Sequence, residues 1–355
     1  MVWCERRDSN PHAVRRWNLN PVRLPIPPLS HRFFAGNFTV IRLASHDNGR
    51  FLLPHAARKL LFYKYNFPPD HIRSRQTSHP PLVPVDHYEN FPVASWLLPH
   101  HLREPIELIY AFARSADDFA DEGELPDTER IALLNGYERE LDLIESGATS
   151  SLPLFASLAE TISRHQLPIQ LFRDLLSAFR QDVTKTRYAN FDELMDYCRR
   201  SANPIGRLLL HLNRQTAPQY LEWSDAICSA LQLTNHWQDV AIDWLKNEGG
   251  RVYLPVDELA SFGLSELDIA KQYNSPQWRK MMAFQCDRAR GLMQFGAPLG
   301  RVLSGRMGAE LRVIIAGGCR ILDKIDAVEG DVFRSRPELS KLDWLSIGPR
   351  ALFSL

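Results

Sequence analysis

Apolar residues between about positions 105 and 326 recur at spacings of three and four, the period of a helix that buries one face. Proline, glycine and short polar clusters divide this stretch into segments. Alternating runs typical of strands are nearly absent. The pattern therefore predicts an all-α chain, with helical segments over 105–123, 128–147, 152–165, 168–184, 191–212, 224–246, 256–297 and 299–326.

This pattern also indicates the domain organisation. We expect one all-α domain, a single-domain helical bundle over residues 86–330, which is long enough to bury a large core. Pro204 is expected to kink the helix over 191–212, and Gly206 should allow a neighbouring helix to approach closely. Residues 331–355, which contain Pro337 and Pro349, are expected to form a loose C-terminal tail.

Residues 1–85 differ from the rest in composition. They contain 11 of the 24 prolines and carry 13 Lys and Arg against 4 Asp and Glu, whereas the remaining residues carry 29 against 38. A basic, proline-rich segment without a period is typical of a disordered extension. A second hypothesis is a mis-assigned start, since Glu5–His12 resembles translated non-coding sequence and the methionine after Met1 is Met195.

The composition and the absence of several motifs disfavour some classes of protein. The five cysteines include no Cys-x-x-Cys pair, which disfavours a disulfide framework and a zinc site and favours a reducing compartment. Neither a signal peptide nor a run of about 18 apolar residues is present. We expect a cytoplasmic protein, with peripheral association with the inner membrane as an open alternative. The basic N-terminal segment lacks the aromatic-basic pattern of a nucleic-acid module, so no nucleic-acid partner is expected.

An acidic stripe marks the first long helix. Tyr110, Arg114, Asp117 and Asp121 follow steps of four, three and four, so they share one helical face, with Asp118 beside them. Carboxylates spaced four residues apart repel each other and destabilise a helix. This unfavourable spacing suggests that a cation lies between them.

A second stripe lies about 120 residues downstream. Gln232, Asn235, Asp239 and Asp243 follow steps of three, four and four. A single acidic pair is most often a solvated helix face, but two such pairs, each within apolar helix, favour a shared cavity lined by carboxylates. Oxygen ligands suit hard cations, so we expect Mg²⁺, with Mn²⁺ as the alternative.

The chain next to the second stripe adds two candidate residues. Gly249 and Gly250 are the expected C-terminal breaker of that helix. Arg251 and Tyr253 follow at once, so we expect both at the mouth of the cavity.

These segments resemble the squalene/phytoene synthase family of head-to-head prenyl transferases, and the resemblance covers His87 to about Lys324. It is specific, because both acidic motifs, their order and their separation fit. Within the family, 87–95, 201–206 and 231–235 look most like bacterial hydroxysqualene synthases of hopanoid pathways. The motifs that carry the resemblance are Tyr110-x-x-x-Arg114-x-x-Asp117-Asp118-x-x-Asp121, Gln232-x-x-Asn235-x-x-Gln238-Asp239-x-x-x-Asp243 and Arg251-Val-Tyr-Leu-Pro255.

The resemblance implies an isoprenoid-synthase-type bundle with a central cavity, and a prenyl diphosphate substrate. It implies that presqualene diphosphate and water are converted into hydroxysqualene and diphosphate. The implied metal-binding and catalytic residues are Asp117, Asp121, Asp239 and Asp243, with Asp118 as a further metal ligand and Tyr110 as a further catalytic residue. The implied substrate contacts are His87, Tyr88, Glu89, Asn90, Tyr110, Arg114, Gln232, Asn235, Arg251 and Tyr253.

The sequence departs from the family pattern at one place, and two alternative functions stay open. Many relatives have a tyrosine just after the cysteine that corresponds to Cys198, where this chain has Arg199 and Arg200, so no role for that tyrosine is carried over. The reaction could instead form presqualene diphosphate or phytoene. A non-catalytic assembly factor is a third hypothesis, disfavoured because the four expected aspartates are all present.

Overall fold

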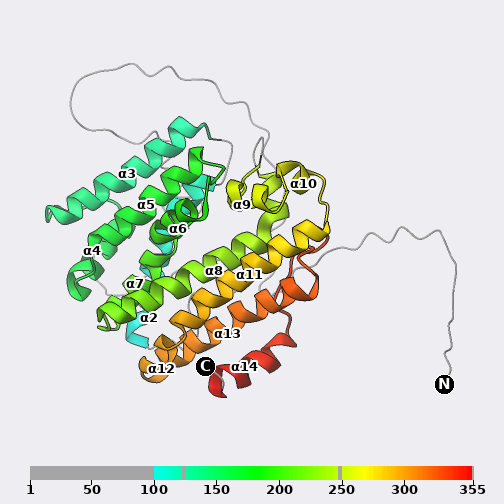
Figure 1. Cartoon of the computed structure of the whole chain (residues 1–355). Coiled ribbons are helices and arrows are strands. Elements are labelled where there is room, and N and C mark those ends of the chain that lie inside the picture. The colour runs from blue at the N-terminus through cyan, green and yellow to red at the C-terminus, as the bar shows by residue number, and fades with distance from the viewer. Residues whose placement is uncertain (1–99, 122–124, 247–249, 354–355) are drawn as a thin grey trace, which may run out of the picture. The chain divides into compact units, whose positions relative to one another are not determined.

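The computed structural model describes residues 100–121, 125–246 and 250–353, and this part of the chain is helical (Figure 1). The predicted segments 1–85 and 86–99, including the candidate residues His87, Tyr88, Glu89 and Asn90, lie outside the described residues. Within the described ranges the only strand-like pairing is an isolated bridge between Arg187 and Val252. The all-α prediction is therefore confirmed.

The helices occur in the predicted order. Their bounds are α2 His100–Asp121, α3 Asp127–Glu145, α4 Pro153–His165, α5 Ile169–Thr184, α6 Phe191–Ser201, α7 Asn203–Leu212, α8 Pro218–Leu245, α9 Val256–Ser261, α10 Glu266–Ala270, α11 Pro276–Gly296, α12 Leu299–Val302, α13 Gly305–Ala327 and α14 Asp343–Phe353.

Two buried clusters hold the bundle together. The first joins α2 to α5 with parts of α7, α8 and α11 to α13. Within it the buried Phe112 contacts Tyr137, Phe155 and Phe172 with ring centroids 5.2 to 5.9 Å apart. The second joins α6, α8, α11 and α13 around the fully buried Trp237. Burying large aromatic rings is the main source of stability in such a core. The helix α8 contributes to both clusters and lies against α11 in Figure 1.

The predicted kink at Pro204 is a complete break. Residues 191–212 form two helices, because Pro204 occupies the first turn of α7, where its missing N–H costs nothing. The close approach predicted for Gly206 is confirmed: a Cβ there would overlap Ser224 Oγ and Cys228 Sγ on α8. The start predicted at Pro105 was wrong by five residues, since α2 begins at His100 and holds this proline in its second turn.

The structure also differs from the loose tail expected over residues 331–355. Asp343 begins α14, and its buried carboxylate pairs with Arg320 at 2.6 Å and Lys324 at 2.7 Å on α13. Ile347 and Ala351 are buried on the inner face of α14. The prediction of a loose tail relied on the prolines, but Pro349 lies within α14 without ending it.

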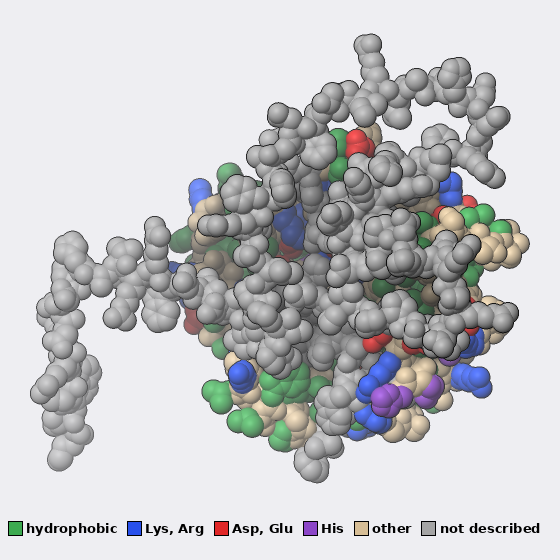
Figure 2. Space-filling view, turned by 180° about the vertical axis from the view of Figure 1, so that it is seen from behind, with side chains coloured by type: hydrophobic (Ala, Val, Ile, Leu, Met, Phe, Trp, Pro, Cys, Tyr) green, Lys and Arg blue, Asp and Glu red, His purple; other side chains and the backbone are tan. Residues whose placement is uncertain are grey.

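The surface offers two further observations. In Figure 2, positive, negative and apolar side chains of the described residues lie interspersed on the face that is seen. Among the described helices, none is both long enough and apolar enough to cross a membrane.

Candidate active site

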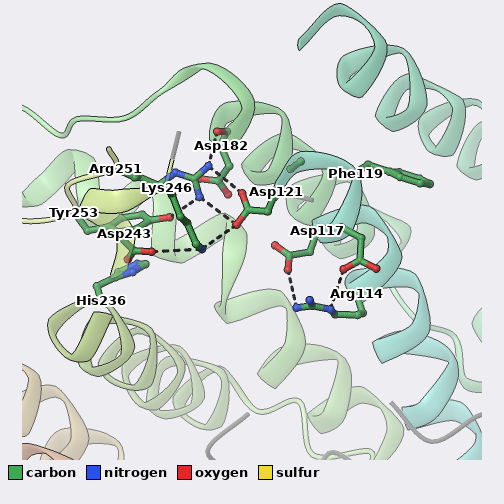
Figure 3. A network of polar contacts seen from close by, with 12 residues as sticks. Arg114, Asp117, Phe119, Asp121, Asp182, His236, Asp243, Lys246, Arg251 and Tyr253 are labelled. Atoms are coloured by element: carbon green, nitrogen blue, oxygen red, sulfur yellow. Dashed lines mark hydrogen bonds and ion pairs between the residues drawn. The ribbon is translucent and has the colours of Figure 1, made fainter. Parts of the chain in front are cut away.

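The two acidic stripes meet at the C-terminal ends of α2 and α8 (Figure 3). The Lys246 Nζ atom lies 3.4 Å from Asp121 Oδ2 and 3.4 Å from Asp243 Oδ1. One ammonium group thus bridges carboxylates from separate helices. The two stripes therefore converge at this point, but the cation between them is a lysine side chain, and the predicted metal ion stays a prediction.

Arg251 is the second cation at this point, and it is only 4% exposed. Its Nη2 atom donates to Asp121 Oδ1 at 2.9 Å and to the Asp182 backbone oxygen at 2.8 Å, while Nη1 lies 3.3 Å from the Tyr253 hydroxyl. The Arg251 backbone N–H donates to the Asp243 carbonyl at 2.7 Å. The predicted pair Arg251 and Tyr253 therefore lies at the junction of the two stripes.

Gly250 makes this arrangement possible. Its φ of +65° is a left-handed conformation that side chains other than glycine rarely adopt. A Cβ at this position would overlap the backbone of Trp244. The chain can therefore turn back on α8 closely enough for Arg251 to reach both Asp243 and Asp121.

The titration of these carboxylates follows from burial and from the two cations. Asp117 is only partly buried, with its side chain 33% exposed. This partial burial raises its pKa toward about 7, with the negative charge of Asp121 acting in the same direction. Burial also raises the pKa of Asp243 to about 6. For Asp121, burial acts in the same direction, but Arg251 and Lys246 outweigh it and lower the pKa. A positive charge nearby favours the charged form of such a carboxylate.

Other candidates on α2 are held by Arg114. This side chain lies 3.0 Å from Asp117 Oδ2 and 3.1 Å from Asp118 Oδ1. The structure thus places Asp118, which is buried, beside Arg114 rather than beside Lys246. Tyr110 is partly buried and packs against the first core cluster.

On α8, Asp239 has a partner that the sequence did not indicate. Arg336, from the segment between α13 and α14, pairs with both Asp239 oxygens. The neighbouring Gln238 donates to the Pro337 backbone oxygen at 2.6 Å. No local pattern could have found these contacts, because they join residues 97 and 99 positions apart within a segment expected to be loose.

The remaining candidates on α8, Asn235 and Gln232, lie one and two helical turns before Asp239. Gln232 Nε2 is 3.4 Å from His236 Nε2, and Asn235 is exposed. The His236 ring stacks on the Tyr253 ring with centroids 3.5 Å apart. Burial lowers the pKa of His236 to about 3, so this ring is neutral at physiological pH.

Sequence reasoning also missed Asp182 and Tyr197. The Tyr197 hydroxyl donates to Asp182 Oδ2 at 2.8 Å, and both side chains are buried. Burial raises the pKa of Asp182 to about 8. Neither residue belongs to a charged repeat, so the only available signal was an acidic residue near the end of an apolar helix.

The two arginines that follow Cys198 have structural partners. Arg200 donates to Asp196, Ser177 and Gln181, which ties α6 to α5. Arg199 donates to Asp196 at the surface. The structure thus gives neither arginine a contact with the two acidic stripes.

The donor set suits a hard divalent cation, although no ready-made metal cluster is present among the described residues. Carboxylate oxygens are the ligands that Mg²⁺ prefers. Asp121 and Asp243 already share one cation. Because burial raises the pKa of Asp117 and of Asp243, a further positive charge nearby would favour the charged form of both. In this structure the carboxylates are neutralised by Lys246, Arg251 and Arg336. A metal ion would therefore have to displace these three side chains. A surface pocket of about 490 Å³ between α11 and α13 is lined by none of the predicted site residues.

Comparison with known proteins settles the family. The model of the squalene/phytoene synthase family matches residues 85–343. The chain belongs to this family. A hydroxysqualene synthase of Sinorhizobium fredii is 36% identical over 74% of this chain and 88% of its own length. A phytoene synthase of Mycobacterium tuberculosis is 33% identical over 75% and 86%. The crystal structure of squalene synthase HpnC from Alicyclobacillus acidocaldarius is 37% identical, with a TM-score of 0.63 over 68% of this chain and 90% of that one.

This membership confirms the resemblance recognised in the sequence and the isoprenoid-synthase type of helical fold. It places the two acidic stripes inside the matched region. The roles of individual residues, the metal and the central cavity stay predictions.

Proposed function

We propose that this family member is a hydroxysqualene synthase, which converts presqualene diphosphate and water into hydroxysqualene and diphosphate with Mg²⁺. The observation that carries the proposal is the meeting of Asp121 and Asp243 around one cation at the ends of two helices. Three relatives named hydroxysqualene synthase, at 34–37% identity, support the choice of reaction.

The proposed metal site uses the carboxylates of both stripes. Asp117 and Asp121 on α2, with Asp239 and Asp243 on α8, are the residues that would hold Mg²⁺ or Mn²⁺. When bound, the metal would neutralise the diphosphate and make it a better leaving group. Arg251, Lys246 and Arg336 lie beside these carboxylates and are suited to donate to diphosphate oxygens.

In the proposed reaction the bond between the substrate carbon and the diphosphate oxygen breaks, and the electron pair leaves with diphosphate. The remaining carbocation has to be shielded from bulk water. The clustered rings of Tyr188, Tyr197 and Tyr253, with centroids 5.5 to 5.7 Å apart, are suited to such shielding and to cation–π contacts. One water oxygen then forms the new carbon–oxygen bond and gives up a proton.

The test is a product assay with purified protein, Mg²⁺ and presqualene diphosphate, without any nicotinamide cofactor. We expect hydroxysqualene and one equivalent of diphosphate, and no product when Mg²⁺ is removed with a chelator. Asp243→Asn is the inactive control. Turnover of farnesyl or geranylgeranyl diphosphate, with presqualene diphosphate untouched, would contradict the proposal.

That last outcome would favour the second candidate, a presqualene diphosphate or phytoene synthase. The specific observation behind it is that phytoene synthases are nearly as similar to this chain, at 31–33% identity. No product from any of the three diphosphates, with intact fold, would support a non-catalytic assembly factor.

We also propose that the protein works in the cytoplasm, peripherally bound to the inner membrane, because its proposed substrate and product are largely hydrocarbon. Sedimentation of the protein with lipid vesicles, in the presence and absence of substrate, tests this. Protein that stays in the supernatant under both conditions would contradict it.

A further inference from the structure

Asp182 is a buried carboxylate that has no role in the proposed reaction so far. It lies near the C-terminal end of α5 and is 5% exposed. Its Oδ2 atom accepts the Tyr197 hydroxyl at 2.8 Å. Its Oδ1 atom is buried and has no hydrogen-bond partner among the described residues. Such a group is costly in a folded protein and calls for an explanation.

Arg251 carries the complementary group. Its Nε–H is likewise buried without a hydrogen-bond partner among the described residues. The two residues are already neighbours, because Arg251 Nη2 donates to the Asp182 backbone oxygen at 2.8 Å. Figure 3 shows the Asp182 side chain next to the Arg251 guanidinium, on the side away from Lys246. A buried donor and a buried acceptor thus lie close together while Arg251 contacts Asp121.

The two cations that contact Asp121 differ in where they could go. The Lys246 side chain is 45% exposed, so it could leave Asp121 and enter solvent. Arg251 is 4% exposed and cannot do so without exposing the segment around it. A buried guanidinium that gives up one carboxylate needs another, because an unpaired buried charge is strongly unfavourable.

We propose that Asp182 is a positioning residue, which accepts the Arg251 guanidinium when Asp121 turns to a metal–diphosphate complex. Arg251 has two arrangements in this proposal: it pairs with Asp121 in the ligand-free site and with Asp182 in the occupied site. The Tyr197 hydroxyl occupies one carboxylate oxygen, so the other is the one that receives Arg251. The inference rests on the proposed function, since it presumes that Asp121 binds metal and diphosphate.

The experiment measures Mn²⁺ binding in the presence of inorganic diphosphate, by loss of the electron paramagnetic resonance signal of aqueous Mn²⁺. In Asp182→Asn, Arg251 keeps Asp121, so we expect the apparent Kd for Mn²⁺ to rise about tenfold, the size of one charge-assisted contact. Tyr197→Phe, which keeps the carboxylate, is the matched control and should change the Kd by less than about threefold. Circular dichroism and thermal unfolding verify that each variant is folded.

A double-mutant cycle separates positioning from a simple loss of negative charge. If Asp182 acts through Arg251, Asp182→Asn should have almost no further effect in an Arg251→Gln background. Equal effects of Asp182→Asn in both backgrounds would overturn the inference, as would an unchanged Kd in the single variant or an equal loss in Tyr197→Phe. If the wild-type protein binds no Mn²⁺ with diphosphate, the proposed function fails and this inference fails with it.

Discussion

Gly250→Ala should damage both stability and the site, and Gly263→Ala provides its matched control. Both glycines have positive φ, +65° and +70°. Alanine in this left-handed conformation should destabilise the folded state by about 1–2 kcal/mol at either position. Lower entropy of the unfolded chain offsets roughly 0.4–1 kcal/mol of that penalty. At Gly263 a Cβ has open space around it, so the net loss there should be about 1 kcal/mol.

At Gly250 a second cost is added. The Cβ would lie 2.8 Å from Trp244 Cα and C, and would overlap its carbonyl oxygen. These are backbone atoms, which cannot rotate away, so we add roughly 1–3 kcal/mol for overpacking. The total of about 2–4 kcal/mol should lower the melting temperature by roughly 5–15 °C, against about 3 °C for Gly263→Ala.

Chemical denaturation of the two variants measures the difference in the free energy of unfolding, and the product assay measures the effect on the site. Gly250→Ala should also lose most activity, because Arg251 can no longer keep its 2.7 Å contact with the Asp243 carbonyl. Gly263→Ala should stay active. Equal stability losses in the two variants, or full activity of Gly250→Ala, would refute the reasoning.

Three further predictions address other parts of the molecule. Asp117→Asn and Asp239→Asn should each remove most activity while the far-ultraviolet circular dichroism stays unchanged; collapse of the fold in either would point to a structural role instead. Asp343→Asn should cost about 1–3 kcal/mol at neutral pH. Although burial opposes it, hydrogen bonds from Lys324 and Ser340 hold the Asp343 pKa well below its usual range, so this contribution is present above about pH 4 and is lost as the pH falls further. Denaturation of variant and wild type should therefore give a difference that shrinks below about pH 4, and a difference independent of pH would contradict the pairing. Gly206→Ala should destabilise by roughly 1–3 kcal/mol through overlap with Ser224, and a partial rescue by Ser224→Gly in thermal unfolding would verify that contact.

Much of the fold and part of the site could be predicted, because the relevant patterns are local. Helical periodicity placed the acidic stripes correctly on α2 and α8, since residues four apart share a face whatever the rest of the chain does. Arg251 and Tyr253 could be placed because they follow α8 directly. Asp182, Tyr197 and Arg336 could not, since tertiary packing alone brings them to the site.

The same distinction explains the errors in the fold. Pro204 indicated a disturbance, but whether a proline bends a helix or begins a new one depends on what its neighbours pack against. The α14 segment is short and contains Pro349, so its own propensity for a helix is low. Its helix is stabilised instead by two salt bridges to α13 and two buried apolar side chains.

The pairing of Arg336 with Asp239 links the segment that precedes the C-terminal helix to the second acidic stripe. A ligand that displaces Arg336 from Asp239 would disturb the segment around Arg336. A few residues further along the chain, Asp343 anchors α14 to Arg320 on α13. By thermodynamic reciprocity, ordering of that helix and occupancy of the carboxylates must influence each other equally. Deuterium uptake by the backbone amides of α14 is therefore expected to change when Mg²⁺ and diphosphate are added, which makes this helix a built-in reporter of occupancy.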